Sequence, residues 1–352
     1  MLGVLDGDPA YQFTDISAVS LTSDGRMVVA DAGSATVRTY DPEGKLLRLL
    51  GGGGSGPGEF VRPSQVLLRD DGSVRVWDDA TFRVTEFDPT GELTGVATFS
   101  REDIAKAVEP PLYPASGLLL SNGDLIVRLI VKTSDLTAGR FRPQTGALRV
   151  AADQSAIDTI LFFRDTEQVS VRLPKGSLPV VPPLARRTTI AIQPNEARLC
   201  IGEQAKPEIL CFGPEGARVV VRWEAERIPV RPDDPALRSW GDSMTELYEQ
   251  KMTAEDADRI LSQVSAPADY PPYTDHVLDR AGYLWVKTSA VDSNAGVDRY
   301  LVFTPTGQQV GPVSVPSVRV LEIGDDYLVG VDRDEFEVQY IKLFRVARPG
   351  SA

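Results

Sequence analysis

The sequence predicts an all-β fold, a six-bladed β-propeller of four-stranded antiparallel blades that forms a single domain over residues 1–352. Two stretches near the N-terminus, residues 13–46 and 60–93, align without a gap. Short glycine-containing turns recur at the same places in both, and β-branched and aromatic residues, which favour strands, lie between the turns. A fixed period of this size is typical of stacked supersecondary units.

Each aligned stretch contains two tight turns. The first turn is SDG or DDG, where glycine tolerates a positive φ. The second is DPEG or DPTG, where proline sets φ and glycine closes the turn. Phe13 aligns with Phe60 and Asp31 with Asp78. We therefore interpret each stretch as one blade.

Weaker copies of the unit follow along the chain. Blade three has SNGDLIVRL and then FRPQTGALRV, and blades four to six keep the turns and the apolar rhythm. The chain contains six first turns but only five second turns, so the last blade lacks an outer strand. We expect residues 2–5 to supply that strand by pairing with residues 340–346, which would protect the sheet edge.

Residues 230–274 are predicted to form a helical insertion between blades four and five. Asp234-Pro235 is a typical helix start, and Thr253 resembles the first residue of a capping box. The first helix has an apolar face formed by Leu237, Trp240, Met244 and Leu247. Either the helices pack on the propeller rim, or they form a lid or a partner-binding pair. A second insert, ILFFRDTEQVSVRLP, is predicted to add a pair of strands before blade four.

Composition restricts the class of partner. The net charge of −13 over 352 residues repels phosphate backbones, so nucleic-acid binding is not expected. No apolar run approaches the ~20 residues that a membrane span needs. We expect a monomer, and we find no signal peptide because repeat-like sequence begins almost at Met1.

The stretch GGGGSGPGEFVRPSQVLLRDDGSVRVWDD resembles the NHL repeat. Blades one and two match that pattern best, and the other blades match it mainly in their turns. The whole chain also resembles uncharacterised bacterial six-bladed β-propeller proteins, through ARRTT before blade four and VRVLEIGDDYLVG in blade six. This resemblance implies a fold and a periplasmic or extracellular location, and it implies almost no chemistry.

One face of the predicted propeller carries the variable loops. The turns between first and second strands, and between third and fourth strands, are short throughout. The links between blades, at 51–62, 100–114, 153–185 and 230–274, are long and irregular. Insertions on one face of a repeat protein usually mark the binding face, although drift of an unconstrained surface would give the same pattern.

Several candidate ligand-binding residues fall at the starts of inner strands, near the mouth of the central channel on the long-loop side. Four are arginines, which bind carboxylate or phosphate bidentately: Arg62, Arg186, Arg187 and Arg319. Alternatively, each arginine pairs with a nearby carboxylate and fastens adjacent blades. Tyr273 and His276 lie at the entry to blade five, where His276 is either near the channel mouth or a residue with a structural or surface role only. Because His276 is the only histidine, sites that need several histidines are excluded.

Aspartates recur at the end of the second strand, at Asp31, Asp78 and Asp332. They either bond the adjoining turn or supply oxygen ligands to Ca²⁺, as in calcium-dependent lactonase-like propellers. Two function classes follow: a non-enzymatic binding or scaffold propeller that engages a protein or a small anionic ligand without a cofactor, and a calcium-type hydrolase or lyase.

The repeat register also places the two cysteines. Cys211 aligns with Thr39 and Glu86, and Cys200 aligns with Val28 and Arg75. An Arg–Glu combination suggests directly opposed residues on neighbouring strands. Opposed residues lie within the span of a disulfide. Cys200 and Cys211 are therefore predicted to face each other, either as a disulfide or as two reduced thiols packed side by side.

Overall fold

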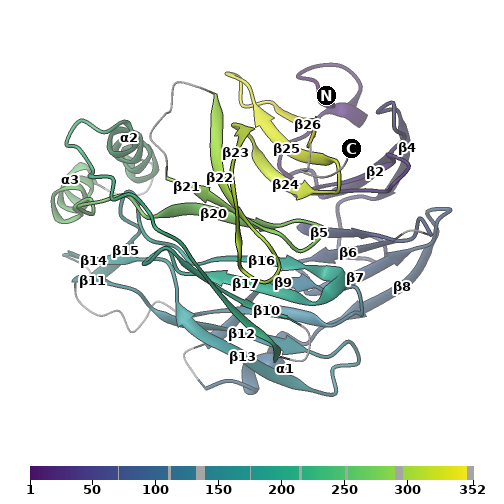
Figure 1. Ribbon diagram of the computed structural model, residues 1–352, viewed down its shortest axis with the longest axis horizontal. Coiled ribbons are helices and arrows are strands. Elements are labelled where there is room, and N and C mark those ends of the chain that lie inside the picture. The colour runs from purple at the N-terminus through teal and green to yellow at the C-terminus, as the bar shows by residue number, and fades with distance from the viewer. Residues whose placement is uncertain are drawn as a thin grey trace.

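The structure is a computed structural model that describes residues 1–346 except 70, 110–111, 132–138, 175, 214–215, 250–252 and 290–295. Its described residues form five four-stranded and two three-stranded sheets, with few helices (Figure 1). The strands within each sheet are antiparallel. The fold is therefore almost all β, as predicted.

Sheets 1 and 2 come from the two aligned stretches. After a short 3-10 helix η1 (Pro9–Tyr11), sheet 1 contains β1 (Ile16–Leu21), β2 (Met27–Asp31), β3 (Thr36–Tyr40) and β4 (Leu46–Gly51). Sheet 2 contains β5 (Pro63–Leu68), β6 (Val74–Asp78), β7 (Arg83–Phe87) and β8 (Leu93–Thr98). Gly25 and Gly72, in the first turns, have φ values of 86° and 85°, as those turns require.

Four further sheets follow in the same strand order. Helix α1 (Arg101–Lys106) precedes sheet 3, which contains β9 (Leu112–Leu119), β10 (Leu125–Val131), β12 (Gln144–Val150) and β13 (Ile157–Arg164). Sheet 4 contains β16 (Thr189–Gln193), β17 (Arg198–Gly202), β18 (Glu208–Phe212) and β19 (Arg218–Arg222), with the 3-10 helix η3 (Pro194–Glu196) between its first two strands. Sheet 5 contains β20 (Tyr273–Leu278), β21 (Leu284–Thr288), β22 (Val297–Phe303) and β23 (Gln309–Pro316). Sheet 6 contains β24 (Arg319–Ile323), β25 (Tyr327–Arg333) and β26 (Gln339–Arg345).

The core lies between the sheets. Six buried apolar clusters each join two neighbouring sheets, and one of them joins sheet 6 to sheet 1 through residues such as Val331 and Ile16. The first strands of all six sheets line a central cavity of about 510 Å³. This circular order around a central channel is propeller-like, because each sheet buries both faces against its neighbours.

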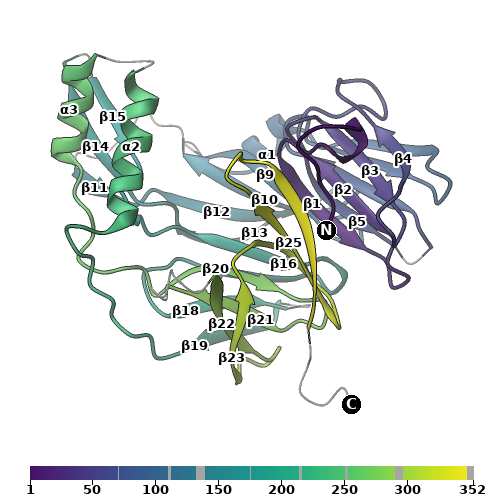
Figure 2. The ribbon, with the colours of Figure 1, turned by 90° about the horizontal axis from the view of Figure 1, so that it is seen from above.

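The helical insertion joins a separate small sheet. Strands β11 (Gly139–Phe141), β14 (Gln168–Leu173) and β15 (Gly176–Val180) form the inserted sheet. Helices α2 (Pro235–Glu249) and α3 (Ala254–Gln263) pack on it, with Trp240, Met244 and Ile260 against its valines. Figure 2 shows this insertion module standing apart at one end of the molecule. The prediction that these helices pack on the propeller rim was wrong, because their apolar faces pack on the inserted sheet. The side chain of Leu247 lies outside the described residues.

Two strand assignments in blade three also differ from prediction. PQTG does not form the turn between the third and fourth strands, because β12 begins within it at Gln144, and the turn falls instead at residues 151–156. ILFFRDTEQVSVRLP is not a pair of extra strands. Its first part ends β13, the outer strand of sheet 3, and its second part forms β14 of the inserted sheet. Periodicity cannot tell which sheet a strand joins.

The N-terminus meets the last sheet, but over a shorter length than predicted. Leu2 and Ile341 exchange two backbone hydrogen bonds, of 2.9 and 2.8 Å. The chain then leaves β26 at Gly3, whose φ of 139° suits glycine, and Val4 donates to the carbonyl of Tyr11 instead. In Figure 1 the purple N-terminal strands lie beside the yellow C-terminal ones. A single bridge thus takes the place of the predicted outer strand.

Candidate functional site on the long-loop face

The topology separates two faces of the ring. Turns between first and second strands, such as 22–26 and 69–73, lie on what we call the short-turn face. The links between sheets leave from the opposite, long-loop face, and they include the inserted strands and both helices. The insertion module therefore rises from the long-loop face, where the sequence places its candidate arginines.

Arg186 and Arg187 lie in a dense group of charged residues between sheets 3 and 4. We call it the junction cluster, and its members are Arg128, Arg140, Arg142, Arg164, Asp165, Glu167, Arg186, Arg187 and Glu203. Glu167 accepts a hydrogen bond from the Arg186 backbone at 3.2 Å and pairs with Arg140 at 2.9 Å. Asp165 pairs with Arg128, and Glu203 accepts from the backbone of Arg164 at 2.9 Å. Six arginines thus face three carboxylates.

Arg142 occupies the middle of this cluster. Its guanidinium donates to the carbonyls of Asp165 at 2.7 Å and Arg164 at 2.9 Å, and to the hydroxyl of Thr188 at 3.2 Å. Burial lowers the pKa of Arg142, while the charges of nearby carboxylates, Glu203 foremost, act in the opposite direction. Because arginine stays charged in proteins, a half-buried cation is held here mainly by neutral carbonyl groups. The junction cluster therefore keeps a positive excess.

The other two candidate arginines lie elsewhere on the same face. Arg62 is exposed at the start of sheet 2, and its backbone donates to Asp78 at 2.9 Å. Arg319 donates to the Ile16 carbonyl and so fastens sheet 6 to sheet 1. It also lines a hollow of about 590 Å³ in which Lys287 and Asp298 pair at 2.6 Å. Among the described residues, no contact joins Arg62 or Arg319 to the junction cluster.

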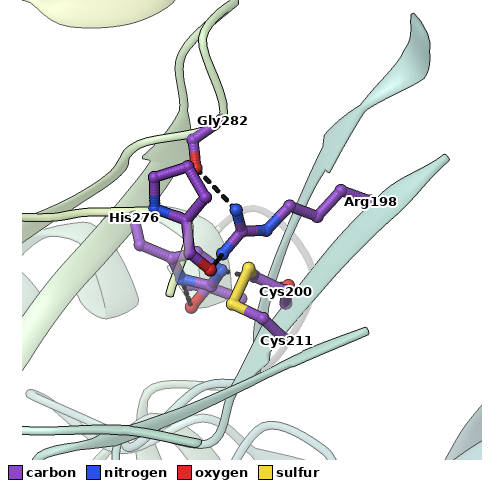
Figure 3. Close-up of a disulfide and its surroundings, with 7 residues drawn as sticks. Arg198, Cys200, Cys211, His276 and Gly282 are labelled. Carbon is purple, nitrogen blue, oxygen red and sulfur yellow. Dashed lines mark hydrogen bonds between the residues drawn. A yellow bond between two sulfur atoms is a disulfide. The ribbon is translucent and has the colours of Figure 1, made fainter. Parts of the chain in front are cut away.

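Tyr273 and His276 are buried between sheets 4 and 5 and do not face the channel mouth. The Tyr273 hydroxyl accepts from the Gln204 backbone at 2.9 Å, and burial raises the pKa of Tyr273 well above its usual range. The His276 ring bonds the Thr189 hydroxyl at 2.8 Å and the Cys200 carbonyl at 3.1 Å (Figure 3). Burial lowers the pKa of His276, although the bond to Cys200 and the charge of Asp275 oppose this. The hydrogen bonds of both side chains therefore connect sheet 5 to sheet 4.

Cys200 and Cys211 form a disulfide close to His276 (Figure 3). The two residues are opposed in the β17–β18 pair, with 4.0 Å between their Cα atoms. This is the register that the repeat alignment predicted. Arg198 extends from the same strand to the carbonyl of Gly282 at 2.8 Å, so this part of sheet 4 is tied to sheet 5.

The three candidate metal-ligating aspartates lie in three different sheets. Asp31 and Asp78 are buried in different sheets, and each accepts four backbone N–H bonds from its own turn and from the link before its sheet. Burial acts to raise the pKa of Asp78, but these bonds outweigh it and the pKa lies below its usual value. Asp332 pairs with Lys342. Among the described residues, no group of three or more His, Cys, Asp or Glu side chains is placed to hold a metal ion.

Sequence reasoning missed Arg140, Arg142 and Arg164. PQTG, residues 143–146, was interpreted as a turn on the short-turn face, so the preceding Arg140 and Arg142 were not expected on the long-loop face. Arg140 lies within β11, Arg142 follows that strand and Arg164 ends β13, and no motif in the sequence marks the three as a group. Only the pairing of β12 with β13 brings residue 144 opposite residue 164 and thereby places these arginines together.

No family model matches the sequence, and no curated protein matches it. Solved structures do resemble it in fold. A member of the DUF4221 family from Bacteroides vulgatus is 9% identical, with a TM-score of 0.51 over 96% of this chain and 95% of that one. A protein from Bacteroides fragilis whose name suggests export is 12% identical, with a TM-score of 0.47 over 94% and 83%. A gluconolactonase from Xanthomonas campestris is 11% identical, with a TM-score of 0.43 over 95% and 88%.

The chain thus has a β-propeller-type fold. At 9% identity, the first of these similarities supports the shared fold and nothing about activity, and the two weaker ones carry no argument. In the part of the chain that the structure describes, no helix is long and apolar enough to cross a membrane.

Proposed function

We propose that this chain is a six-bladed, NHL-like propeller that acts without catalysis and binds an anionic ligand, or an acidic surface of a partner, at the junction cluster. The observation that supports it is the excess of arginine over carboxylate in that cluster, in a chain whose net charge is −13. A local positive field in an acidic protein draws anions to one place.

The two outermost arginines of the cluster are the proposed contacts. Arg187 is exposed and Arg186 half-exposed, and neither forms an ion pair with any described residue. Their backbones are held by Glu167 and Gln204, at 3.2 and 2.8 Å. A fixed backbone with a free guanidinium suits bidentate recognition of a carboxylate, because less backbone freedom is lost on binding.

The alternative, a calcium-dependent hydrolase or lyase, has less support. Its candidate ligands Asp31 and Asp78 are already occupied by backbone N–H groups, and Asp332 is paired with Lys342. We also propose that the protein is exported, because a disulfide such as Cys200–Cys211 forms and persists in oxidising compartments.

Calorimetric titration with citrate at low ionic strength tests the proposal. We expect binding by the unmodified protein and a loss of roughly tenfold or more in affinity for Arg187→Glu, since a charged hydrogen-bond donor is replaced by a repelling carboxylate. The matched control is Arg48→Glu, an exposed arginine on the short-turn face. Equal loss in both variants, or no binding of citrate at all, contradicts the proposal.

A further inference from the structure

The hollow that Arg319 lines lies between sheets 5 and 6, at the long-loop face. Its volume is about 590 Å³, within the range of small-molecule sites. Its wall is formed where β20, β22 and β24 begin and where β21 and β25 end. A buried apolar cluster packs the same two sheets together, and Tyr300, Val318 and Val320 belong to both the cluster and the wall. The apolar core therefore closes one end of the hollow.

Five charged side chains line this hollow, and three of them are already paired. The five are Asp275, Lys287, Asp298, Arg319 and Arg333. Lys287 pairs with Asp298 at 2.6 Å, and Arg333 pairs with Glu337, which lies outside the wall, at 2.9 Å. The other two, Asp275 and Arg319, form no ion pair with any described residue. One carboxylate and one guanidinium therefore remain.

Asp275 is the remaining carboxylate, on the sheet 5 wall. It is opposed to Lys287 in the β20–β21 pair, but the Lys287 ammonium binds Asp298 instead. Asp275 is exposed, and among the described residues its carboxylate accepts only from the His276 backbone, at 2.8 Å. Because an ionised carboxylate has acceptor sites for about four hydrogen bonds, Asp275 keeps most of its capacity for a cationic group.

Tyr300 lies on the same wall and is opposed to Lys287 from the other side, in the β21–β22 pair. It is only 3% exposed, and its hydroxyl forms no hydrogen bond with any residue that the structure describes. Burial and the charges of Asp298 and Asp275 raise the pKa of Tyr300 well above its usual range. The hydroxyl therefore keeps its proton. A buried polar group without a partner indicates a contact that a ligand can make.

Arg319 is the remaining cation, and it lies on the opposite wall, in sheet 6. Its guanidinium donates to the Ile16 carbonyl, and the described residues offer it no other hydrogen bond. Partial burial lowers the pKa of Arg319, while the charge of Asp15 acts in the opposite direction and that of Arg333 in the same one. Since arginine stays charged and has five N–H donors, Arg319 can bind a further acceptor.

Asp275 and Arg319 thus line one hollow without reaching each other. A ligand that carries both an ammonium and a carboxylate would satisfy the two charges at once, because each charged wall would gain its opposite. Three valines, Val318, Val320 and Val331, supply the apolar part of the wall. The uncharged remainder of the wall is Thr274 and Ser317.

We propose that this hollow binds a free α-amino acid with an apolar side chain. The ammonium binds Asp275 and the Tyr300 hydroxyl on sheet 5, and the carboxylate binds Arg319 on sheet 6. The side chain packs on the valines. This site is separate from the junction cluster, which lies between sheets 3 and 4, and it does not depend on the function proposed there.

Calorimetric titration with leucine tests this proposal, with N-acetyl-leucine and leucinamide as analogues that lack the ammonium and the carboxylate. We expect one leucine per chain and roughly tenfold weaker binding of either analogue, since each loses charge-assisted hydrogen bonds. Leucinamide tests the Arg319 end without a substitution, because a substitution there would also remove the bond to the Ile16 carbonyl.

Two variants test the sheet 5 wall. Asp275→Asn should weaken leucine binding roughly tenfold, and Tyr300→Phe roughly fivefold, because each removes one partner of the ammonium. Both variants are expected to fold. Asparagine can still accept from the His276 backbone, and the Tyr300 hydroxyl has no hydrogen bond to lose in the described part of the chain.

The controls separate this site from the proposed anion site. Asp158→Asn, at an exposed aspartate of β13, and Tyr340→Phe, in β26, lie outside the hollow and should leave leucine binding unchanged. Arg187→Glu should also leave it unchanged. An absence of saturable leucine binding, equal binding of either analogue, or full affinity in both Asp275→Asn and Tyr300→Phe overturns the proposal. Lost citrate binding with normal leucine binding would count against the junction cluster alone.

Discussion

At the scale of single residues, polar side chains fasten one sheet to the next. The Gln65 amide exchanges two hydrogen bonds with the backbone of Leu119, of 3.0 and 2.7 Å. The Gln339 amide reaches from sheet 6 to Thr14 and Ile16 of sheet 1 in the same way, at 3.1 and 2.9 Å. Each such amide satisfies a backbone group that would otherwise be buried unpaired.

His276 performs this role between sheets 4 and 5, and its role depends on protonation. A carbonyl only accepts, so Nε2 carries the proton toward Cys200, and Nδ1 accepts from Thr189. The neutral ring therefore satisfies both contacts. Burial lowers the pKa of His276, so the unfolded chain takes up the proton first as pH falls.

We therefore expect the free energy of unfolding to fall as the pH drops below about 6.5, the usual pKa of histidine in an unfolded chain, and down to the lowered pKa of the folded state. Denaturant unfolding between pH 7.5 and 5.5 measures this. Because the chain has a single histidine, His276→Asn should show a flatter pH dependence, although it is less stable at pH 7.5. Parallel curves for the two proteins would show that His276 does not cause the effect.

At the scale of strands and turns, the β17–β18 pair shows how far repeat alignment can place residues. Arg75 and Glu86 are opposed in sheet 2 and pair at 2.5 Å, and Cys200 and Cys211 are opposed in sheet 4. Blade two therefore predicted the register of blade four. The alignment fails in blade three, because PQTG resembles DPTG in letters but falls at the start of a strand.

The disulfide should be detectable as an absence of thiols. Titration of the unfolded, unreduced protein with a thiol reagent is expected to find none, and two after reduction. The double variant Cys200→Ala/Cys211→Ala should lower the free energy of unfolding by about 2–3 kcal/mol, since the bond closes a short loop in the unfolded chain. Two reactive thiols before reduction would contradict the pairing.

At the scale of the whole molecule, the ring is closed by a cluster between sheets 6 and 1 to which the N-terminus contributes. Leu2 is only 8% exposed and packs with Ile341 and Tyr40, in addition to its two backbone bonds. Past Ile341 the chain of residues 1–7 no longer follows β26, and Leu343 on that strand is exposed. Closure thus depends on this residue pair, on the apolar packing behind it, and on the hydrogen bonds that Gln339 and Arg319 form with the start of sheet 1.

Deleting residues 1–6 should therefore lower the free energy of unfolding by about 2–4 kcal/mol, from the lost burial of Leu2 and the lost pair of hydrogen bonds. Denaturant unfolding of the truncated and full chains measures the difference. Leu2→Ala should reproduce roughly half of it, whereas Leu5→Ala, at an exposed position, should change little. An unchanged midpoint for the truncated chain would show that the bridge does not contribute to closure.

The sequence by itself determined most of the strands and turns, the helix starts at Pro235 and Thr253 and the facing cysteines, because these depend on local propensity and on a period that repeats along one chain. Tertiary structure alone decided the rest. Only the tertiary contacts place His276 and Tyr273 in the interior, bring Arg142 and Arg164 near Arg187, and pack the helices on the inserted sheet. These outcomes depend on contacts between residues far apart in the sequence, for which a repeat pattern has no signal.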